Sequence, residues 1–301
     1  MASALEVEVR PPSPFLLPRR GSEDRVMRAG DGSVSRLLHL DGAAVLVRAW
    51  QPASKRVFFR AEPVDPGAVA APCTASEPPH RRAGRADLAR AVERMRFALG
   101  VDDDLGEFYL RFRRDPLLGP LLRRRPHLRP RRRPFAWEAL AWAIVKQLIE
   151  SDRAARIQRR IVGRWGLRLG RDREALRDVP APALIAGRAP AELESMGLAL
   201  KRAIALRAVA ADIAAARCDP ADPGAEARFL RVPEIGPWTV QCVGLFGRGD
   251  PDSLPAGDLV YLKLVGRLSR LRRRATVEEV EEFYAPYAPF RGLAALWTAG
   301  I

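Results

Sequence analysis

Residues 230–239 (LRVPEIGPWT) constrain the fold of this chain more than any other stretch. Pro233 cannot continue a preceding helix, because proline lacks an N–H and disfavours helical dihedrals in the residue before it. Gly236 can adopt a positive φ, and Pro237 suits the first turn of a new helix. The stretch predicts two helices joined by a tight hairpin whose free N–H groups can bind an anion. Taken alone, it is more typical of a buried corner that binds nothing.

The charge balance favours a polyanionic partner. The chain has 51 Lys and Arg against 36 Asp and Glu, a net charge of +15 at pH 7 and a pI of about 10.9. Such values are typical of proteins that bind nucleic acid. Nearly all the basic residues are arginines, which indicates a GC-rich genome and weakens the signal, but the excess over acidic residues remains.

The three cysteines and three histidines are scattered, so neither a disulfide framework nor a metal site is expected. No signal-peptide segment stands at the N-terminus, and no apolar run is long enough to span a membrane. These features predict a cytoplasmic protein without a metal or other cofactor.

Residues 1–84 are predicted to form a small strand-rich domain followed by a linker. Asp41-Gly42 is a strong hairpin-turn signal between two apolar segments. The linker is expected over residues 63–84, which are rich in Pro, Gly and Ala. Strands are expected over residues 5–10, 34–40, 43–50 and 55–61.

Residues 85–301 show helical spacing of apolar residues and are predicted to form a helical domain. The segment 135–149 is apolar nearly all round, so we place it at the centre of that domain. Before it, residues 123–133 contain seven arginines in eleven positions, interrupted by prolines. This basic run suits a loop along a phosphate backbone, and a solvated surface loop is an equal alternative.

The hairpin is followed by a second helix, by Gly257 and Asp258, and by a further apolar helix. This order resembles the helix-hairpin-helix DNA glycosylases, and within them the DNA-3-methyladenine glycosylase II branch, which repairs alkylated DNA. The resemblance covers residues 85–301 and more weakly the N-terminal part. It implies a mainly α fold, with a two-lobed helical domain after a small α/β domain. It also implies a hairpin that grips a DNA phosphate and an active-site aspartate, here Asp258.

The resemblance further implies a set of DNA contacts. Leu148 matches the apolar residue that enters the duplex in place of an extruded base. The alternative is that Leu148 is merely the last core residue of its helix. Glu234 stands where the hairpin of the family usually has glycine. The implied contacts are Gln147, Leu148, Glu234, Gly236 and Thr239, together with Arg131, Arg132 and Arg133 from the basic run.

An alkylated, cationic base should be held by aromatic faces. Trp238 and Trp297 match two tryptophans that line the base pocket in the alkylation branch, although Trp297 would suit core packing equally well. Cys242 and Leu259 occupy the positions of two pocket tyrosines. These departures leave the range of lesions open.

The chemistry needs only one carboxylate. The glycosidic bond breaks through an oxocarbenium-like transition state, and a base that is already cationic leaves without a general acid. Asp258 could stabilise the sugar cation and orient or deprotonate water. Because Asp258 opens a helix, backbone N–H groups favour its ionised form. An ordinary helix cap is the alternative, and one aspartate can perform both roles.

Two absences define the reaction type. Bifunctional members of the family carry a nucleophilic lysine where this chain has Trp238, and the branches with an iron–sulfur cluster need cysteines that are absent after Cys242. We therefore expect a monofunctional, base-flipping, bacterial enzyme that acts as a monomer on double-stranded DNA with damaged bases. A non-catalytic DNA-binding protein with the same hairpin, or a glycosylase for a different damaged base, are the alternatives.

Overall fold

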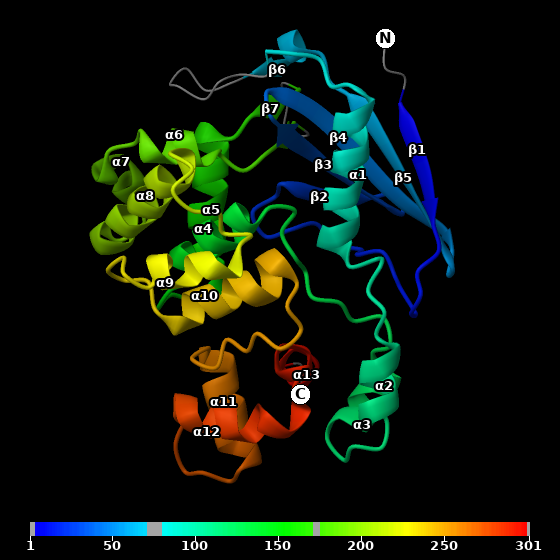
Figure 1. The fold of residues 1–301 in the computed structure, drawn as a ribbon, viewed down its shortest axis with the longest axis vertical. Helices are drawn as coiled ribbons and strands as arrows, with labels where there is room; N and C mark the ends of the chain where they lie inside the picture. The colour runs from blue at the N-terminus through cyan, green and yellow to red at the C-terminus, as the bar shows by residue number, and fades with distance from the viewer. Residues whose placement is uncertain (1–3, 71–79, 171–174, 300–301) are drawn as a thin grey trace.

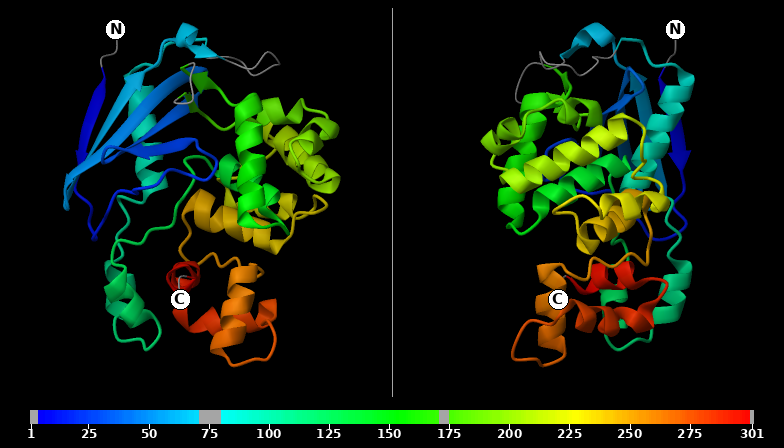
Figure 2. Two further views of the ribbon diagram at one scale, coloured as in Figure 1. Left: turned by 180° about the vertical axis from the view of Figure 1, so that it is seen from behind. Right: turned by 60° about the vertical axis from the view of Figure 1, so that its left-hand side comes forward.

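The computed structural model describes residues 4–70, 80–170 and 175–299 and shows helices beside an N-terminal sheet (Figures 1 and 2). Five antiparallel strands form this sheet in the order β1-β5-β4-β3-β2. They are β1 Leu5–Val9, β2 Met27–Gly30, β3 Ser33–Leu40, β4 Ala43–Ala53 and β5 Arg56–Pro63. The predicted strands and the turn between β3 and β4 are confirmed. Asp41 and Gly42 both have a positive φ (43° and 78°), which this hairpin turn requires.

Helix α1 (Arg85–Leu99) lies across one face of the sheet, as Figure 1 shows. Its buried side chains, among them Leu88 and Met95, share an apolar core with Phe59 of β5. The first helix after the predicted linker therefore packs on the strands. The division of the chain into domains 1–84 and 85–301 remains a prediction.

The segment 63–84, predicted to be a linker, begins with ordered structure. A short helical turn, η1 (Pro66–Ala68), leads into β6 (Val69–Ala70). Strand β6 pairs with β7 (Arg168–Leu169), which pairs in turn with β8 (Leu176–Arg177). This small sheet fastens the start of the linker to the helical part. Residues 71–79, including Cys73, lie outside the described residues.

The remaining helices form two lobes with separate apolar cores. The lobe whose core includes Leu140, Trp142, Leu206 and Val243 is named lobe one. Helix α4 is buried along almost its whole length, as its apolar sequence predicts. Lobe one comprises α4 Ala136–Lys146, α5 Ser151–Trp165, α6 Pro182–Ala186, α7 Pro190–Ser195, α8 Leu200–Ala214, α9 Glu226–Phe229, α10 Pro237–Val243 and the π-helical turn η3 Gly244–Arg248.

Lobe two is built from two separate parts of the chain around a core that includes Phe108, Tyr284 and Trp297. Its helices are α2 Gly106–Phe112, α3 Leu118–Arg124, α11 Leu259–Leu268, α12 Val277–Tyr284 and α13 Arg291–Thr298. In Figure 1 the helices α2 and α3 lie beside α11, α12 and α13, below lobe one. The predicted mainly α fold with a small N-terminal sheet is confirmed. No helix within the described residues is long and apolar enough to cross a bilayer.

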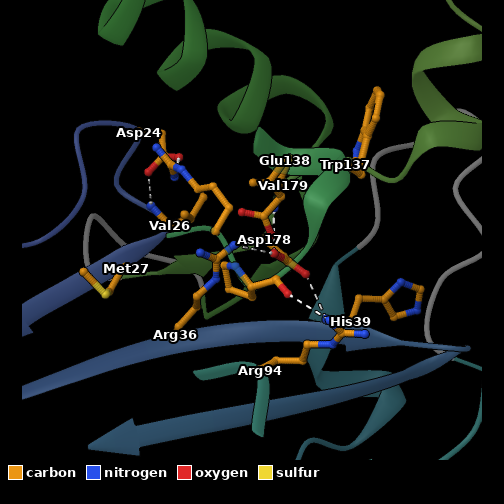
Figure 3. A network of polar contacts seen from close by, with 12 residues as sticks. Asp24, Val26, Met27, Arg36, His39, Arg94, Trp137, Glu138, Asp178 and Val179 are labelled. Atoms are coloured by element: carbon orange, nitrogen blue, oxygen red, sulfur yellow. Dashed lines mark hydrogen bonds and ion pairs between the residues drawn. The ribbon is translucent and has the colours of Figure 1, made fainter. Parts of the chain in front are cut away.

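A buried polar network joins the sheet to lobe one (Figure 3). Arg36 of β3 is 3% exposed and donates to Glu138 of α4 at 2.6 Å. Its guanidinium also lies 3.5 Å from a carboxylate oxygen of Asp178. Asp178 accepts two backbone hydrogen bonds, from His39 at 2.8 Å and from Val179 at 2.7 Å. One arginine therefore faces two carboxyl groups in the interior.

These contacts set the protonation of the network. Burial raises the pKa of Glu138 to about 7 against the attraction of Arg36, and burial also raises the pKa of Asp178. The second oxygen of Glu138 has no hydrogen-bond partner, which fits a carboxyl group that keeps its proton. For Asp24 burial also opposes the charge, but the charges of Arg133 and Arg36 and the hydrogen bonds from Ser22 and Val26 together outweigh it and hold the pKa at about 2.

Candidate nucleic-acid interface and active site

The hairpin between α9 and α10 has the predicted position but a different left-handed residue. Glu234 has φ = 72°, whereas Gly236 is extended with φ = −110°. The expectation of a positive φ at Gly236 is wrong because Pro237 follows it, and proline holds the preceding residue in extended conformations. The turn closes with a hydrogen bond from the Ile235 N–H to the Val232 carbonyl at 3.1 Å.

The backbone donors of the hairpin are fewer than predicted. The Thr239 N–H donates to the Gly236 carbonyl at 3.0 Å, and the Thr239 side chain is buried. Thr239 is therefore a structural residue and does not face a ligand. Within the described residues, the N–H groups of Gly236 and Trp238 have no hydrogen-bond partner. Nothing lies within 4 Å of the position that a Cβ would take at Gly236, so this face of the hairpin is open.

Leu148 lies outside the helix that was expected to contain it. Helix α4 ends at Lys146, and Leu148 follows with φ = 53° and a side chain that is 98% exposed. The alternative of a last core residue is thus excluded. The Gln147 amide donates to the Glu234 carbonyl at 2.7 Å and to the Thr239 hydroxyl at 2.9 Å. Gln147 therefore braces the loop of Leu148 against the hairpin.

Asp258 links the two lobes. It is the N-cap of α11 in lobe two, where Oδ1 accepts from the Val260 N–H at 2.9 Å. Its other oxygen, Oδ2, accepts from the Trp238 indole N–H at 3.3 Å, and Trp238 belongs to α10 of lobe one. One oxygen caps the helix while the other faces the junction between the lobes. The two roles foreseen for this residue are therefore geometrically compatible.

The surroundings of Asp258 contain one residue that the sequence analysis missed. Tyr261 stands three residues after Asp258, so it lies on the same side of α11. Its side chain is buried, and burial followed by the Asp258 charge raises the pKa of the phenol. The same two causes raise the pKa of the buried Cys242 thiol. Leu259, the first residue of α11 after Asp258, is 45% exposed. The i+3 spacing from Asp258 was the signal that could have revealed Tyr261.

Trp297 does not reach the surface around Asp258 and Trp238. Its exposed fraction is zero, and it packs against Phe108 and Tyr109 with ring centroids 5.3 and 6.5 Å away. The core-packing alternative therefore describes its place, and a role in an open base pocket is not supported.

The basic run 123–133 requires a correction. Arg132 forms two hydrogen bonds with Asp103, at 2.7 and 2.9 Å, and stacks on Phe97. Arg133 forms an ion pair with the buried Asp24. These two arginines fasten the segment before α4 to the rest of the molecule, so they are not available to phosphates. Arg131 is exposed.

A hairpin between two helices, an exposed leucine braced against it and an aspartate between two helical lobes define the helix-hairpin-helix class of protein. Residues 141–289 match the family model described as HhH-GPD superfamily base excision DNA repair protein. The chain belongs to this superfamily.

Two relatives carry names from DNA repair. The DNA-3-methyladenine glycosylase of Bacillus subtilis (strain 168) is 24% identical over 203 residues, which cover 65% of this chain and 67% of that protein. A protein of Mycobacterium tuberculosis (strain CDC 1551 / Oshkosh), described as a probable bifunctional transcriptional activator/DNA repair enzyme AlkA, is 30% identical over 225 residues. That match covers 70% of this chain but only 43% of the relative.

Solved structures share the fold over nearly the whole chain. The 3-methyladenine DNA-glycosylase from Archaeoglobus fulgidus aligns with a TM-score of 0.77 at 19% identity, covering 98% of this chain and 96% of that one. The Clostridium acetobutylicum 8-oxoguanine glycosylase/lyase, in complex with double-stranded DNA, aligns with a TM-score of 0.63 at 14% identity, covering 91% and 96%. At these identities the likeness concerns the fold alone.

Proposed function

We propose that this chain is a monofunctional DNA glycosylase that turns an alkylated purine out of duplex DNA and hydrolyses its N-glycosidic bond. The observation that carries the proposal is the placement of Asp258. Its Oδ1 is engaged by the helix cap, while Oδ2 lies against Trp238 at the junction of the lobes. A carboxylate fixed in this way is ready to stabilise a developing sugar cation without reorganising.

The DNA-facing parts converge on the same region. Leu148 projects into solvent beside the hairpin, and Gln147 holds the two together. Leu148 fills the space left by the extruded base, and the N–H groups of Gly236 and Trp238 bind a backbone phosphate. Trp238 stands between the hairpin and Asp258, where its ring can stack on a cationic base. The name of the Bacillus subtilis relative supports an alkylated purine as substrate.

The proposed reaction has no covalent intermediate, because Trp238 occupies the place of the amine nucleophile. Lys146 lies near enough to the Cys242 thiol for its charge to lower the pKa of that thiol. Its ammonium group is paired with Glu23 at 3.2 Å, so we do not assign it the role of the nucleophile. The product is then an intact strand with an abasic site. Borohydride should trap no protein–DNA adduct, and efficient trapping would contradict the monofunctional mechanism.

The decisive test is the single-turnover release of 3-methyladenine or 7-methylguanine by the wild type and by Asp258→Asn. Asparagine is also a good N-cap, so the variant should lose at most about 1 kcal/mol of unfolding free energy. Removing the charge should slow base release by roughly 10²–10³ while DNA binding persists. A duplex with 8-oxoguanine serves as the substrate control.

Other outcomes assign other functions. A variant that unfolds much more easily but releases the base at the wild-type rate would make Asp258 a structural cap. A wild type that binds duplex DNA but releases no alkylated base would support the non-catalytic alternative. Preferential release of 8-oxoguanine would show that the substrate is an oxidised base.

A further inference from the structure

Helix α11 carries a row of exposed side chains away from Asp258. Leu259 and Val260 at its start are 45% and 49% exposed, and Lys263 is exposed one turn further on. Residues three and four apart on a helix share a face, so these side chains form one continuous row. In Figure 1, α11 runs from the neighbourhood of α10 toward the lower edge of the molecule.

The loop between α11 and α12 folds back along the same helix. The Leu271 N–H donates to the Gly266 carbonyl at 2.8 Å, and the Ala275 N–H donates to the Leu262 carbonyl at 2.9 Å. The contact at Gly266 is so close that a Cβ there would lie 2.5 Å from the Arg273 carbonyl oxygen. The backbone of this loop is therefore held in a fixed position beside α11.

The loop is strongly basic. Between Asp258 and Glu278 the chain has no acidic residue, and its basic residues are Lys263, Arg267, Arg270, Arg272, Arg273 and Arg274. Arg273 is neutralised by Glu279 of α12 at 2.7 Å. Arg270, Arg272 and Arg274 are exposed, and no carboxylate of the described residues lies within ion-pair distance of them. We call these three residues the basic arm.

We propose that the basic arm binds the phosphate backbone of duplex DNA beyond the damaged base, on the side that the hairpin does not reach. This inference rests on the DNA binding proposed above. At about 1.5 Å of rise per residue, the end of α11 at Leu268 lies roughly 15 Å from Asp258 along the helix axis, and Arg270 follows it. At 3.4 Å per base-pair step, that length corresponds to about four base pairs or slightly more. The hairpin belongs to lobe one and the arm to lobe two, with Asp258 between them.

The test compares two duplexes of 9 and 25 base pairs, each with a central abasic-site analogue. The full chain is measured as wild type and as the triple variant Arg270→Gln, Arg272→Gln, Arg274→Gln. If two of the arginines contact phosphates, the slope of log K against log salt should become shallower by about 1.8. At 0.15 M salt the Kd for the long duplex should then rise roughly 30-fold, with a much smaller change for the short duplex.

A matched control removes three exposed charges elsewhere, in Arg48→Gln, Lys55→Gln, Arg85→Gln, on the sheet and at the start of α1. This control should bind both duplexes as the wild type does. Equal losses on both duplexes, an unchanged salt slope, or the same loss in the control would overturn the inference. In that case the arm only balances the exposed glutamates of α12. A wild type that binds neither duplex would reject both proposals, whereas binding without base release would reject only the catalytic one.

A single substitution separates binding from folding. Arg270 has φ = 55° directly after the end of α11, at a position where helices usually have glycine. Arg270→Gly should raise the melting temperature while it weakens binding of the long duplex. A variant that melts later and binds both duplexes unchanged would remove Arg270 from the arm.

Discussion

Leu148 combines two features that cost free energy in the folded protein. A left-handed conformation costs a residue with a Cβ about 1–2 kcal/mol, and a leucine that is 98% exposed recovers nothing by burial. Residues held in such conformations concentrate at binding sites. Their cost is consistent with a side chain whose partner is the base stack of DNA.

Leu148→Ala should therefore leave the unfolding free energy within about 0.5 kcal/mol of the wild type, because the side chain has no contacts to lose. Base release should slow by roughly tenfold or more, since filling the vacated space offsets unstacking costs of a few kcal/mol. Binding to undamaged duplex should change little. Leu110→Ala, at another exposed leucine (66%), is the control. A similar loss of initial binding and of base release would count against insertion.

At the scale of the element, the hairpin shows what local chemistry can and cannot predict. Pro237 fixes where α10 begins, and Asp258 fixes the start of α11. Helix α9 ends at Phe229, four residues before Pro233, so Pro233 does not set its end. We assigned the left-handed conformation to Gly236, because glycine adopts it most easily, and did not allow for the effect of Pro237 on the residue before it. Pro237 holds Gly236 extended, so the turn falls on Glu234.

This conformation yields a pair of opposite expectations. Glu234→Gly should raise the unfolding free energy by about 1 kcal/mol by relieving the left-handed strain, and should tighten DNA binding by removing a negative charge from the hairpin. Gly236→Ala should cost at most about 1 kcal/mol as a poorer N-cap, but it places a methyl group on the open face and should weaken binding. Urea unfolding and DNA titrations measure both effects. Equal affinities for the two variants would show that the phosphate binds elsewhere.

The basic run failed as a predictor for a different reason. The carboxylates that neutralise Arg132 and Arg133 are Asp103 and Asp24, which are distant in the sequence. Composition counts charges but does not reveal which of them are paired. The location of Trp297 beside Phe108 of α2 was hidden for the same reason, because it depends on how the two parts of lobe two meet.

At the scale of the whole molecule, the network around Arg36 should make stability depend on pH. The folded-state pKa of Glu138, about 7, lies above the value of 4.5 expected when unfolded. Between these pH values the folded protein retains a proton that the unfolded chain loses, so the unfolding free energy falls as pH rises. A shift of that size corresponds to roughly 3 kcal/mol, which is lost as pH rises from the unfolded pKa through the folded one and is gone about one pH unit above the folded pKa.

Glu138→Gln imitates the protonated carboxyl group and should remove most of this slope, as measured by urea unfolding at pH 5 and pH 8. The exposed Glu107→Gln is the control and should retain it. If wild type and Glu138→Gln lost the same free energy between the two pH values, Glu138 would be ionised throughout and another group would supply the proton.

The assembly of lobe two from two parts of the chain has a consequence during synthesis. Helix α3, the second of the pair α2 and α3, ends at Arg124. Their partner α11 begins at Leu259, 135 residues later (259 − 124). At 5–20 residues per second, a ribosome needs about 7–27 s to make that length. Phe108 and Leu118 thus emerge well before the helices that will bury them. Helices α2 and α3 stay unburied until the last seventh of the chain has been made, and chaperones that shield apolar segments have most to do in that interval.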